Sequence, residues 1–262
     1  MPLSSPVDVE TLFGDLSPRR ALVMVAHPDD ADFVCGGTMA LLCRAGWEVD
    51  LLVATNGNKG TKDLNRTSQQ LAAEREEEQR RAAAILGLNE PVFLGFGDGD
   101  LNNDDELRGL LVRELRRLRP TLAITWDGYR PGFNHRDHRN IGQAACDAVY
   151  PSADDHLFYP EHRDEGLSPH RPDVLLLAGT TDPDIVIDIE PVLKEKVAAV
   201  SAHFSQVSGR TPEQMLSWWR ERAESEAIER GGKLIGPRYR ESFTRMSWER
   251  SRRSRRKRTA KR

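Results

Sequence analysis

Residues 21–38 read ALVMVAHPDDADFVCGGT, and this stretch decides the fold. Its first part, Ala21–Ala26, is a short apolar run with the length and composition of a buried parallel strand. An imidazole and two carboxylates follow at once, from His27, Asp29 and Asp30, before a glycine turn that begins a helix. We therefore expect an α/β fold, a Rossmann-like and mostly parallel sheet flanked by helices, with the site at the C-terminal ends of the strands.

The residue types at this strand end are typical of a metal site. Imidazole and carboxylate groups suit Zn²⁺ or a similar divalent ion. In the His-x-x-Asp pattern, His27 and Asp30 can face one point while Asp29, between them, faces another. One carboxylate can then bind a metal while its neighbour takes a proton. The alternative is an ordinary loop with a surface histidine and a helix-capping aspartate.

A second polar cluster reads NHRDH at residues 134–138 and follows the apolar run 121–125. Because it also lies beyond a strand end, we expect it to share an edge of the sheet with the first cluster. A catalytic zinc site uses three protein ligands and an open fourth position, so either His135 or His138 can supply the third ligand. The other histidine becomes a candidate acid, with Asp137 as its orienting partner.

Three motifs together resemble those of the PIG-L/LmbE-like deacetylase superfamily: AHPDD at residues 26–30, CGGT at 35–38 and HRDH at 135–138. The similarity extends from about Ala21 to Gln206. Members of this superfamily remove acetyl groups from N-acetylglucosamine units. The chain departs from the family pattern at Ala31, where an acidic residue usually follows the second aspartate. We interpret this as a change beside the site that leaves the ligands in place.

The resemblance implies a zinc-dependent hydrolase that removes an N-acetyl group from an N-acetylglucosamine-type small molecule. It assigns His27, Asp30 and His138 as the metal ligands and Asp29 as the general base. Zn²⁺ is the expected ion, and Fe²⁺ could occupy the same ligands in a reducing cell. In this scheme a metal-activated water attacks the amide, since Zn²⁺ can lower the pKa of a bound water to roughly 7.

The resemblance also implies roles for residues around the metal. A protonated His135 would stabilise the oxyanion, with Asp137 keeping His135 oriented and raising its pKa. Arg75, in a helix expected over 67–86, matches a family arginine that reaches the polar head of the substrate. Asp98 resembles an acid of the family that hydrogen-bonds sugar hydroxyls. We therefore expect Arg75 and Asp98 to bind substrate.

Periodicity predicts the remaining elements. Apolar runs predict strands at 47–55, 92–94, 121–125, 174–178 and 185–188. Helices are expected at 38–45, 67–86, 104–118, from His138 to Val149, from Pro191 and at 211–230. In the irregular segment 151–172 the histidines are expected at the surface; these are His156, His162 and His170.

Composition bounds the class of protein. Of the 262 residues, 38% are hydrophobic and 30% are charged, which fits a soluble globular protein. We see no repeat or linker, so we expect one deacetylase domain over 21–249 after an N-terminal extension, 1–20. Residues 250–262 hold nine Lys or Arg and no acid, and we expect a disordered basic tail. The rest carries 29 basic against 41 acidic residues, which argues against nucleic acid as a partner.

The cysteine content and the hydropathy indicate in which cellular compartment the protein is found. The three cysteines, Cys35, Cys43 and Cys146, are too scattered for a disulfide framework, which favours the cytoplasm. We expect no membrane span, because no apolar run approaches the roughly 20 residues that one needs. The expected partner is a small-molecule amino-sugar conjugate, and relatives in the family form assemblies, which leaves a homo-oligomer open.

Two alternatives to deacetylation stay open. The same zinc chemistry could hydrolyse another amide, such as a thiol conjugate, and the motifs do not separate the two reactions. A non-catalytic binding protein with a metal site is disfavoured, because ligands, base and acid occur together. A non-haem iron oxygenase would also use two histidines and a carboxylate. Its usual His-x-Asp spacing and β-fold do not match this sequence.

Overall fold

The apolar run before His27 forms β1 (Arg20–Val25), which lies in the middle of a seven-stranded sheet. The computed structural model describes residues 8–207, 210–229 and 238–246. The strand order is β3-β2-β1-β4-β5-β7-β6. The other strands are β2 (Glu48–Thr55), β3 (Val92–Phe96), β4 (Leu122–Trp126), β5 (Val174–Ala178), β6 (Ile185–Asp188) and β7 (Arg240–Met246). Strands β1 to β5 pair in parallel and β7 runs antiparallel to β5 and β6, so the expected mostly parallel sheet is confirmed.

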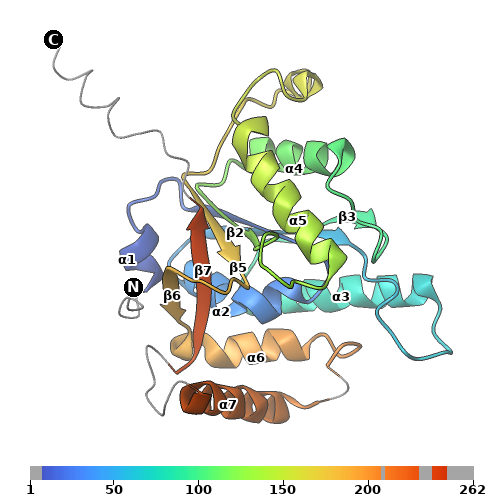
Figure 1. Cartoon of the computed structure of the whole chain (residues 1–262), viewed down its shortest axis with the longest axis vertical. Helices are drawn as coiled ribbons and strands as arrows, with labels where there is room; N and C mark the ends of the chain where they lie inside the picture. Colours follow the sequence, from blue (N-terminus) through green and yellow to red (C-terminus); the bar gives the residue numbers. More distant parts are fainter. Residues whose placement is uncertain (1–7, 208–209, 230–237, 247–262) are drawn as a thin grey trace.

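Helices cover both faces of the sheet (Figure 1). They are α1 (Val9–Phe13), α2 (Asp30–Arg44), α3 (Ser68–Leu86), α4 (Asp105–Leu118), α5 (Arg136–Asp147), α6 (Leu193–Ser201) and α7 (Pro212–Glu229), with short turns of other helix types at Ala148–Ser152, Pro160–Arg163 and Glu190–Val192. Helices α4 and α5 lie on one face, and α2, α3, α6 and α7 lie on the other. In the part of the chain that the structure describes, no helix has the length and apolar character that crossing a membrane requires.

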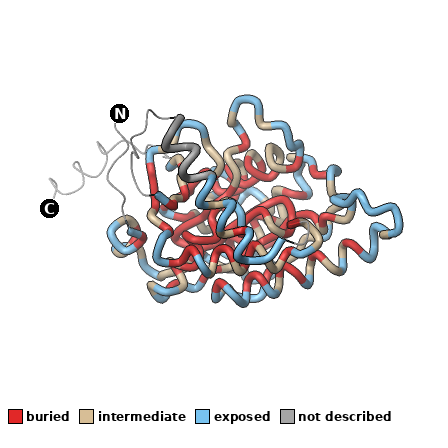
Figure 2. The backbone as a smooth tube through the Cα atoms, turned by 90° about the horizontal axis from the view of Figure 1, so that it is seen from below, coloured by how far each residue is buried: buried red, intermediate tan, exposed pale blue. Residues whose placement is uncertain are grey.

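Successive side chains of β1 pack on opposite faces of the sheet, which explains why helices cover both faces. Val23 and Val25 pack into the hydrophobic cluster that contains α2 and α6, whereas Leu22 and Met24 pack into the cluster with α4 and α5. Successive side chains of a strand point to opposite faces, so a continuous apolar run needs a layer on each side. Figure 2 shows the result, with the buried backbone gathered in the middle of the molecule and the exposed segments around it.

The strand order places the site. The chain proceeds outward from β1 to β2 and β3, then returns to pair β4 with the other side of β1. In open α/β sheets, ligands bind outside the carboxyl ends of the strands at such a reversal. The polar residues 27–30 follow β1 and residues 127–138 follow β4. The two motifs therefore meet at one edge of the sheet, as expected.

Helix α2 is broken at Cys35, where φ is −144° and ψ is 17°. The break starts a second helical segment, and its free N–H groups at Gly37 and Thr38 donate to the Glu241 carboxylate at 2.9 and 2.7 Å. Lys196 of α6 pairs with Glu241 and donates to the Phe33 carbonyl at 2.8 Å. A carboxylate at a helix N-terminus satisfies orphan donors and complements the helix dipole.

Several expectations need correction. The helix expected from Thr38 begins eight residues earlier, at Asp30. Within the N-terminal extension 1–20, the described residues form α1 and supply the first residue of β1. Strand β7 was not expected at all. His162 is buried, not at the surface; its ring stacks on Tyr159, and Arg116 lies against its Nδ1. The basic tail at 250–262 lies outside the described residues.

Replacing Lys196 by Met should destabilise the protein by about 3–5 kcal/mol, because it leaves the buried Glu241 charge without its partner. Lys194→Met, on the exposed side of the same helix, is the matched control and should stay within about 0.5 kcal/mol. Urea unfolding at neutral pH measures both free energies. Equal values for the two variants would contradict the importance of this ion pair.

Candidate active site

Two imidazoles and one carboxylate converge at the edge where β1 and β4 end. His27 and Asp30 come from the β1–α2 junction and His138 from the first turn of α5. His27 Nδ1 lies 3.1 Å from His138 Nε2. The two oxygens of Asp30 contact one ring each: Oδ2 lies 3.4 Å from His27 Nδ1, and Oδ1 lies 3.0 Å from His138 Nε2. Ligand atoms around a tetrahedral Zn²⁺ with bonds of about 2.0–2.1 Å lie about 3.3 Å apart. The three donors therefore fit a divalent metal ion.

The electrostatics of the cluster favour a cation. Burial alone would lower the pKa of His27, but the Asp30 charge and a hydrogen bond to Asp137 raise it to about 12. Burial would likewise raise the pKa of Asp30, but the rings of His138 and His27 hold it well below its usual range. A metal ion displaces protons from such donors, so the same negative field that binds a proton here also favours a divalent ion.

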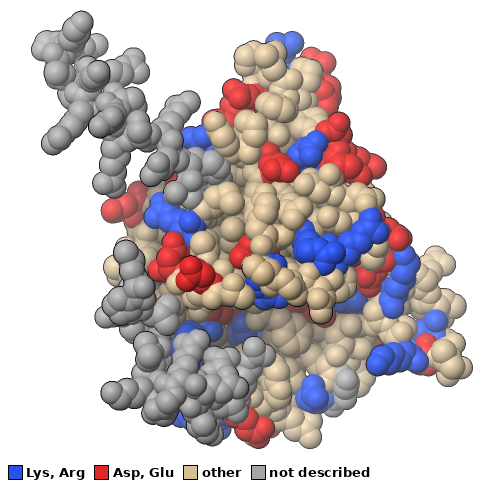
Figure 3. Space-filling model, viewed as in Figure 1, with Lys and Arg blue, Asp and Glu red and all other residues tan. Residues whose placement is uncertain are grey.

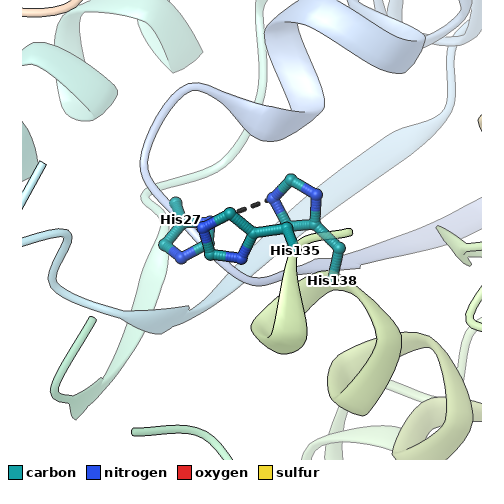
Figure 4. Close-up of side chains that lie close together, drawn as sticks. All are labelled: His27, His135 and His138. Carbon is teal, nitrogen blue, oxygen red and sulfur yellow. Dashed lines mark hydrogen bonds between the residues drawn. The ribbon is translucent and has the colours of Figure 1, made fainter. Parts of the chain in front are cut away.

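Other donor combinations lie close by. His135 joins His27 and His138 in a group whose ligand atoms lie within 4.8 Å of one another (Figure 4), and His27 forms another such group with Asp98 and Asp137. The His135 ring stacks on His138 with centroids 4.5 Å apart, and His135 is exposed. It is thus the histidine of the cluster that a substrate can approach most easily.

Trp126, the last residue of β4, forms a wall of the cluster. Its ring stacks on His138 with centroids 4.5 Å apart and an interplanar angle of 13°. Its Nε1–H donates to Asp30 Oδ2 at 3.1 Å, and the backbone N–H of His27 donates to the same oxygen at 2.8 Å. These donors leave Asp30 Oδ1 facing His138. Phe133 also contacts the His138 ring, with centroids 5.3 Å apart.

The expected partner of Asp137 was wrong. Its fully buried carboxylate lies 3.1 Å from His27 Nε2 and accepts the Gly99 N–H at 2.6 Å. Asp137 thus orients a metal-ligand candidate, and the expected orientation of His135 by Asp137 is not what the structure has. The pKa of His135 is lowered by burial and by the neighbouring His27 ring, whereas we expected it to be raised.

Asp29 has the environment of a general base. Its φ of 105° is a region that residues other than glycine rarely adopt, and such strain is common at functional sites. The backbone N–H donates to Gln79 Oε1 at 2.8 Å, and Arg75 Nη2 lies 3.3 Å from Asp29 Oδ2. Burial raises the pKa of Asp29 to about 6, even though the Arg75 charge opposes the shift.

The two expected substrate residues both lie beside the cluster. Arg75 is 3% exposed and donates to the carbonyls of Pro28 and Gly57 at 2.6 and 3.0 Å, so it braces two loops behind Asp29. Asp98 is half-buried 3.3 Å from His27 Nε2, and this hydrogen bond lowers the pKa of Asp98. Direct contact of either residue with substrate stays a prediction.

A buried network that the motifs do not reveal lies behind Asp29. Gln79 donates to Asp32 Oδ2 at 2.9 Å, and His203 Nε2 lies 2.9 Å from the same oxygen. Gln79 lies four residues after Arg75, so both point from one face of α3, a spacing that could have identified it. Ala31, where the family usually has an acidic residue, is fully buried. Asp32, one residue later, provides the carboxylate of this network.

Comparison with known proteins gives a consistent result. The family model described as GlcNAc-PI de-N-acetylase, PIG-L, matches residues 22–149. The chain is 33% identical over 225 residues to a diacetylchitobiose deacetylase of Thermococcus kodakarensis, covering 86% of this chain and 82% of that protein. It is 28% identical to a 1D-myo-inositol 2-acetamido-2-deoxy-α-D-glucopyranoside deacetylase of Rhodococcus jostii, covering 74% and 83%.

A solved structure agrees. The N,N′-diacetylchitobiose deacetylase of Pyrococcus horikoshii, in complex with an inhibitor, matches with a TM-score of 0.79 and 29% identity, covering 91% of this chain and 87% of that one. Fold and site together define a de-N-acetylating hydrolase of the metal-dependent class. The chain belongs to the PIG-L family, so the resemblance carried by its motifs is confirmed.

Asp137→Asn should weaken Zn²⁺ binding by about 10- to 100-fold, because the carboxylate that orients the His27 ring and raises its basicity is lost. Competition with a chromogenic chelator measures the affinity. Asp147→Asn, at the far end of the same helix, is the control and should bind as the parent does. An unchanged affinity in Asp137→Asn would contradict this role.

Proposed function

We propose that this chain removes the acetyl group from an N-acetylglucosamine-type small molecule, using a divalent metal ion held by His27, Asp30 and His138. The observation that carries the proposal is the triangle of two imidazole nitrogens and a carboxylate, with donor distances of 3.0–3.4 Å, beside the Asp29 carboxylate. The hydrolase class of the family supports the same reaction.

Zn²⁺ is the ion we propose, since two histidines and one carboxylate form a known catalytic zinc set that leaves a fourth position open. When bound, the ion would acidify a water molecule and polarise the carbonyl of the acetamide. Fe²⁺ would use the same three ligands. The Asp137 carboxylate, by accepting from His27 Nε2–H, would fix the tautomer of that ligand.

Asp29 is the general base in this proposal. A carboxylate with a pKa of about 6 is ionised at neutral pH, yet basic enough to take a proton from the attacking water. It would then return the proton to the leaving amine nitrogen. Arg75 and Gln79 support this role by anchoring the side chain and the strained backbone of Asp29.

His135 would donate a hydrogen bond to the oxyanion of the tetrahedral intermediate. It lies on the open side of the cluster, and its edge meets the His27 ring at a centroid distance of 4.6 Å. Because its pKa is lowered, we expect the neutral ring to donate its N–H at neutral pH, in place of the imidazolium expected from the sequence. Asp98, beside the cluster, would hydrogen-bond the sugar hydroxyls.

The relatives support a more specific proposal for the identity of the substrate. Diacetylchitobiose and the inositol conjugate named for them both contain an N-acetylglucosamine unit. On the face drawn in Figure 3, basic and acidic side chains lie side by side, which supports a small molecule over nucleic acid. A homo-oligomer and the cytoplasm stay predictions from the sequence.

Asp29→Asn and Asp30→Asn separate base from ligand. Asp29→Asn should keep one Zn²⁺ per chain and lose about 10²- to 10⁴-fold in kcat, because proton transfer fails. Asp30→Asn should lose the metal itself. Metal content by atomic spectrometry and acetate release from N-acetylglucosamine derivatives measure both. Equal metal content together with equal activity in the two variants would contradict the roles of Asp29 as base and Asp30 as ligand.

Protein from which the metal has been removed provides a second part of this test. Without metal it should release no acetate, and added Zn²⁺ should restore the release. Zinc-dependent acetate from any N-acetylglucosamine derivative would support the proposal. A protein that binds one metal per chain and releases acetate from none of them would refute it, and thiol-conjugate amides would be assayed next.

A further inference from the structure

The two histidines of the metal-site candidate are held in different ways. His27 Nδ1 faces the cluster, and its Nε2 lies 3.1 Å from the Asp137 carboxylate, an acceptor behind the ring. His138 Nε2 faces the cluster as well, but its Nδ1 is buried and has no hydrogen-bond partner among the described residues. Histidines that bind metals usually donate from the second nitrogen, and that bond fixes the ring. His138 is therefore oriented by something other than a hydrogen bond.

The indole of Trp126 lies against the His138 ring. The centroids of the two rings are 4.5 Å apart, and the rings are 13° from parallel. The ring of Phe133 lies 5.3 Å from each of them, again between centroids. An imidazole held between aromatic neighbours cannot turn without losing these contacts. Stacking thus takes the place of the missing hydrogen bond.

The same indole also holds the carboxylate of the cluster. Its Nε1–H donates to Asp30 Oδ2 at 3.1 Å. The backbone N–H groups of Ala26 and His27, at the end of β1, donate to the same oxygen at 3.2 and 2.8 Å. Because Trp126 belongs to β4, the carboxylate is held from two neighbouring strands. One side chain therefore contacts two of the three metal-ligand candidates.

The backbone at Gly179 determines how deep the indole lies. Gly179 directly follows β5 and has a φ of 69°. A Cβ atom at this position would lie 2.6 Å from Cζ3 of Trp126 and 2.9 Å from Cε3. Atoms at these distances overlap, so the absence of a side chain at residue 179 makes room for the indole.

Two hydrogen bonds hold the chain at Gly179 in place. Arg130 Nη1 donates to the Gly179 carbonyl at 2.6 Å, and the Arg130 guanidinium lies 3.8 Å above the centre of the Phe133 ring. The Asp127 N–H donates to the carbonyl of Ala178, the preceding residue, at 2.8 Å. The chain after β5 is thereby fixed to the chain after β4, and the indole lies between this backbone and His138.

Resting on the proposed metal site, we propose that Trp126 is a positioning residue for the metal ion and that Gly179 sets the position of its indole. The ring face of Trp126 orients His138, and its N–H orients Asp30. Neither Trp126 nor Gly179 touches the reacting atoms in the proposed chemistry, so both act through the metal ligands. The arrangement of the ligands thus depends on the loop after β5, which supplies none of them.

The affinity of Trp126 variants for Zn²⁺ tests the two contacts of the indole. Trp126→Phe keeps an aromatic face and loses the N–H, and it should weaken binding about tenfold. Trp126→Leu loses both contacts and should weaken binding about 100-fold. Competition with a chromogenic chelator measures the affinities. Equal affinities in the parent and in both variants would overturn the proposal.

Trp47→Phe is the matched control for loss of a buried indole. Trp47 precedes β2, so it lies at the opposite end of the sheet from the metal-site candidate. Its Nε1–H has no hydrogen-bond partner among the described residues, so the phenyl ring removes no bond. This variant should bind Zn²⁺ as the parent does.

A double-mutant cycle tests the role of Gly179. Gly179→Ala should weaken Zn²⁺ binding about tenfold, because the new Cβ displaces the indole from both ligands. A phenyl ring is shorter than an indole, so the same substitution should change the affinity less than about twofold in Trp126→Phe. Equal effects in the two backgrounds would overturn this role. Gly166→Ala controls for backbone strain, since φ is 76° there and no atom lies within 4 Å of an added Cβ.

The visible spectrum of bound Co²⁺ reports on the ligands independently of stability. The d–d bands of Co²⁺ depend on how its ligands are arranged. At full occupancy the bands of Trp126→Phe should differ from those of the parent, whereas the bands of Trp47→Phe should coincide with them. Identical bands in all three proteins would overturn the proposal.

Acetate release separates this proposal from the proposed reaction. A parent protein that binds Zn²⁺ and releases no acetate from any N-acetylglucosamine derivative would refute the reaction, and the affinities of the Trp126 variants would still decide the positioning role. A parent that releases acetate while all variants bind Zn²⁺ equally would keep the reaction and overturn the role of Trp126.

Discussion

The carboxylate of Asp30 is the point on which the site depends. One of its oxygens accepts hydrogen bonds from the backbone after β1 and from the indole at the end of β4, and the other faces His138. Each of these donors comes from a different segment, so a single side chain fixes the relative positions of two strand ends and a helix start. Its negative charge also favours a cation at the neighbouring imidazoles.

A second set of contacts sets Asp29 apart from Asp30. Asp29 and Asp30 are adjacent in sequence, yet their pKa values shift in opposite directions. The positive φ of Asp29 turns its carboxylate toward Arg75, while Asp30 begins the helix and faces the histidines. Two chemically identical groups thereby acquire opposite pKa shifts from their surroundings, as the proposed division into a base and a metal ligand requires.

How far the sequence predicted this structure depends on the range of the interaction. The central strands follow from apolar runs, and the metal-site candidates follow from motifs that each lie at one strand end, where topology brings them together. The partner of Asp137 could not be predicted, because a carboxylate two residues from His135 reaches instead across the sheet edge to His27. Strand β7 carries charged and polar residues and shows no apolar run, so only its pairing with β5 and β6 reveals it.

Glu241, which pairs with Lys196, also determines when α2 can form its full set of hydrogen bonds during synthesis. Glu241 caps the second segment of α2 across 204 residues of sequence, so the N–H group of Gly37 lacks this partner until residue 241 has left the ribosome. Contacts between distant segments form late and slowly. The helix that carries a metal-ligand candidate at its start therefore receives this cap only when β7 (Arg240–Met246) has been synthesised, which couples maturation of the site to the folding of β7.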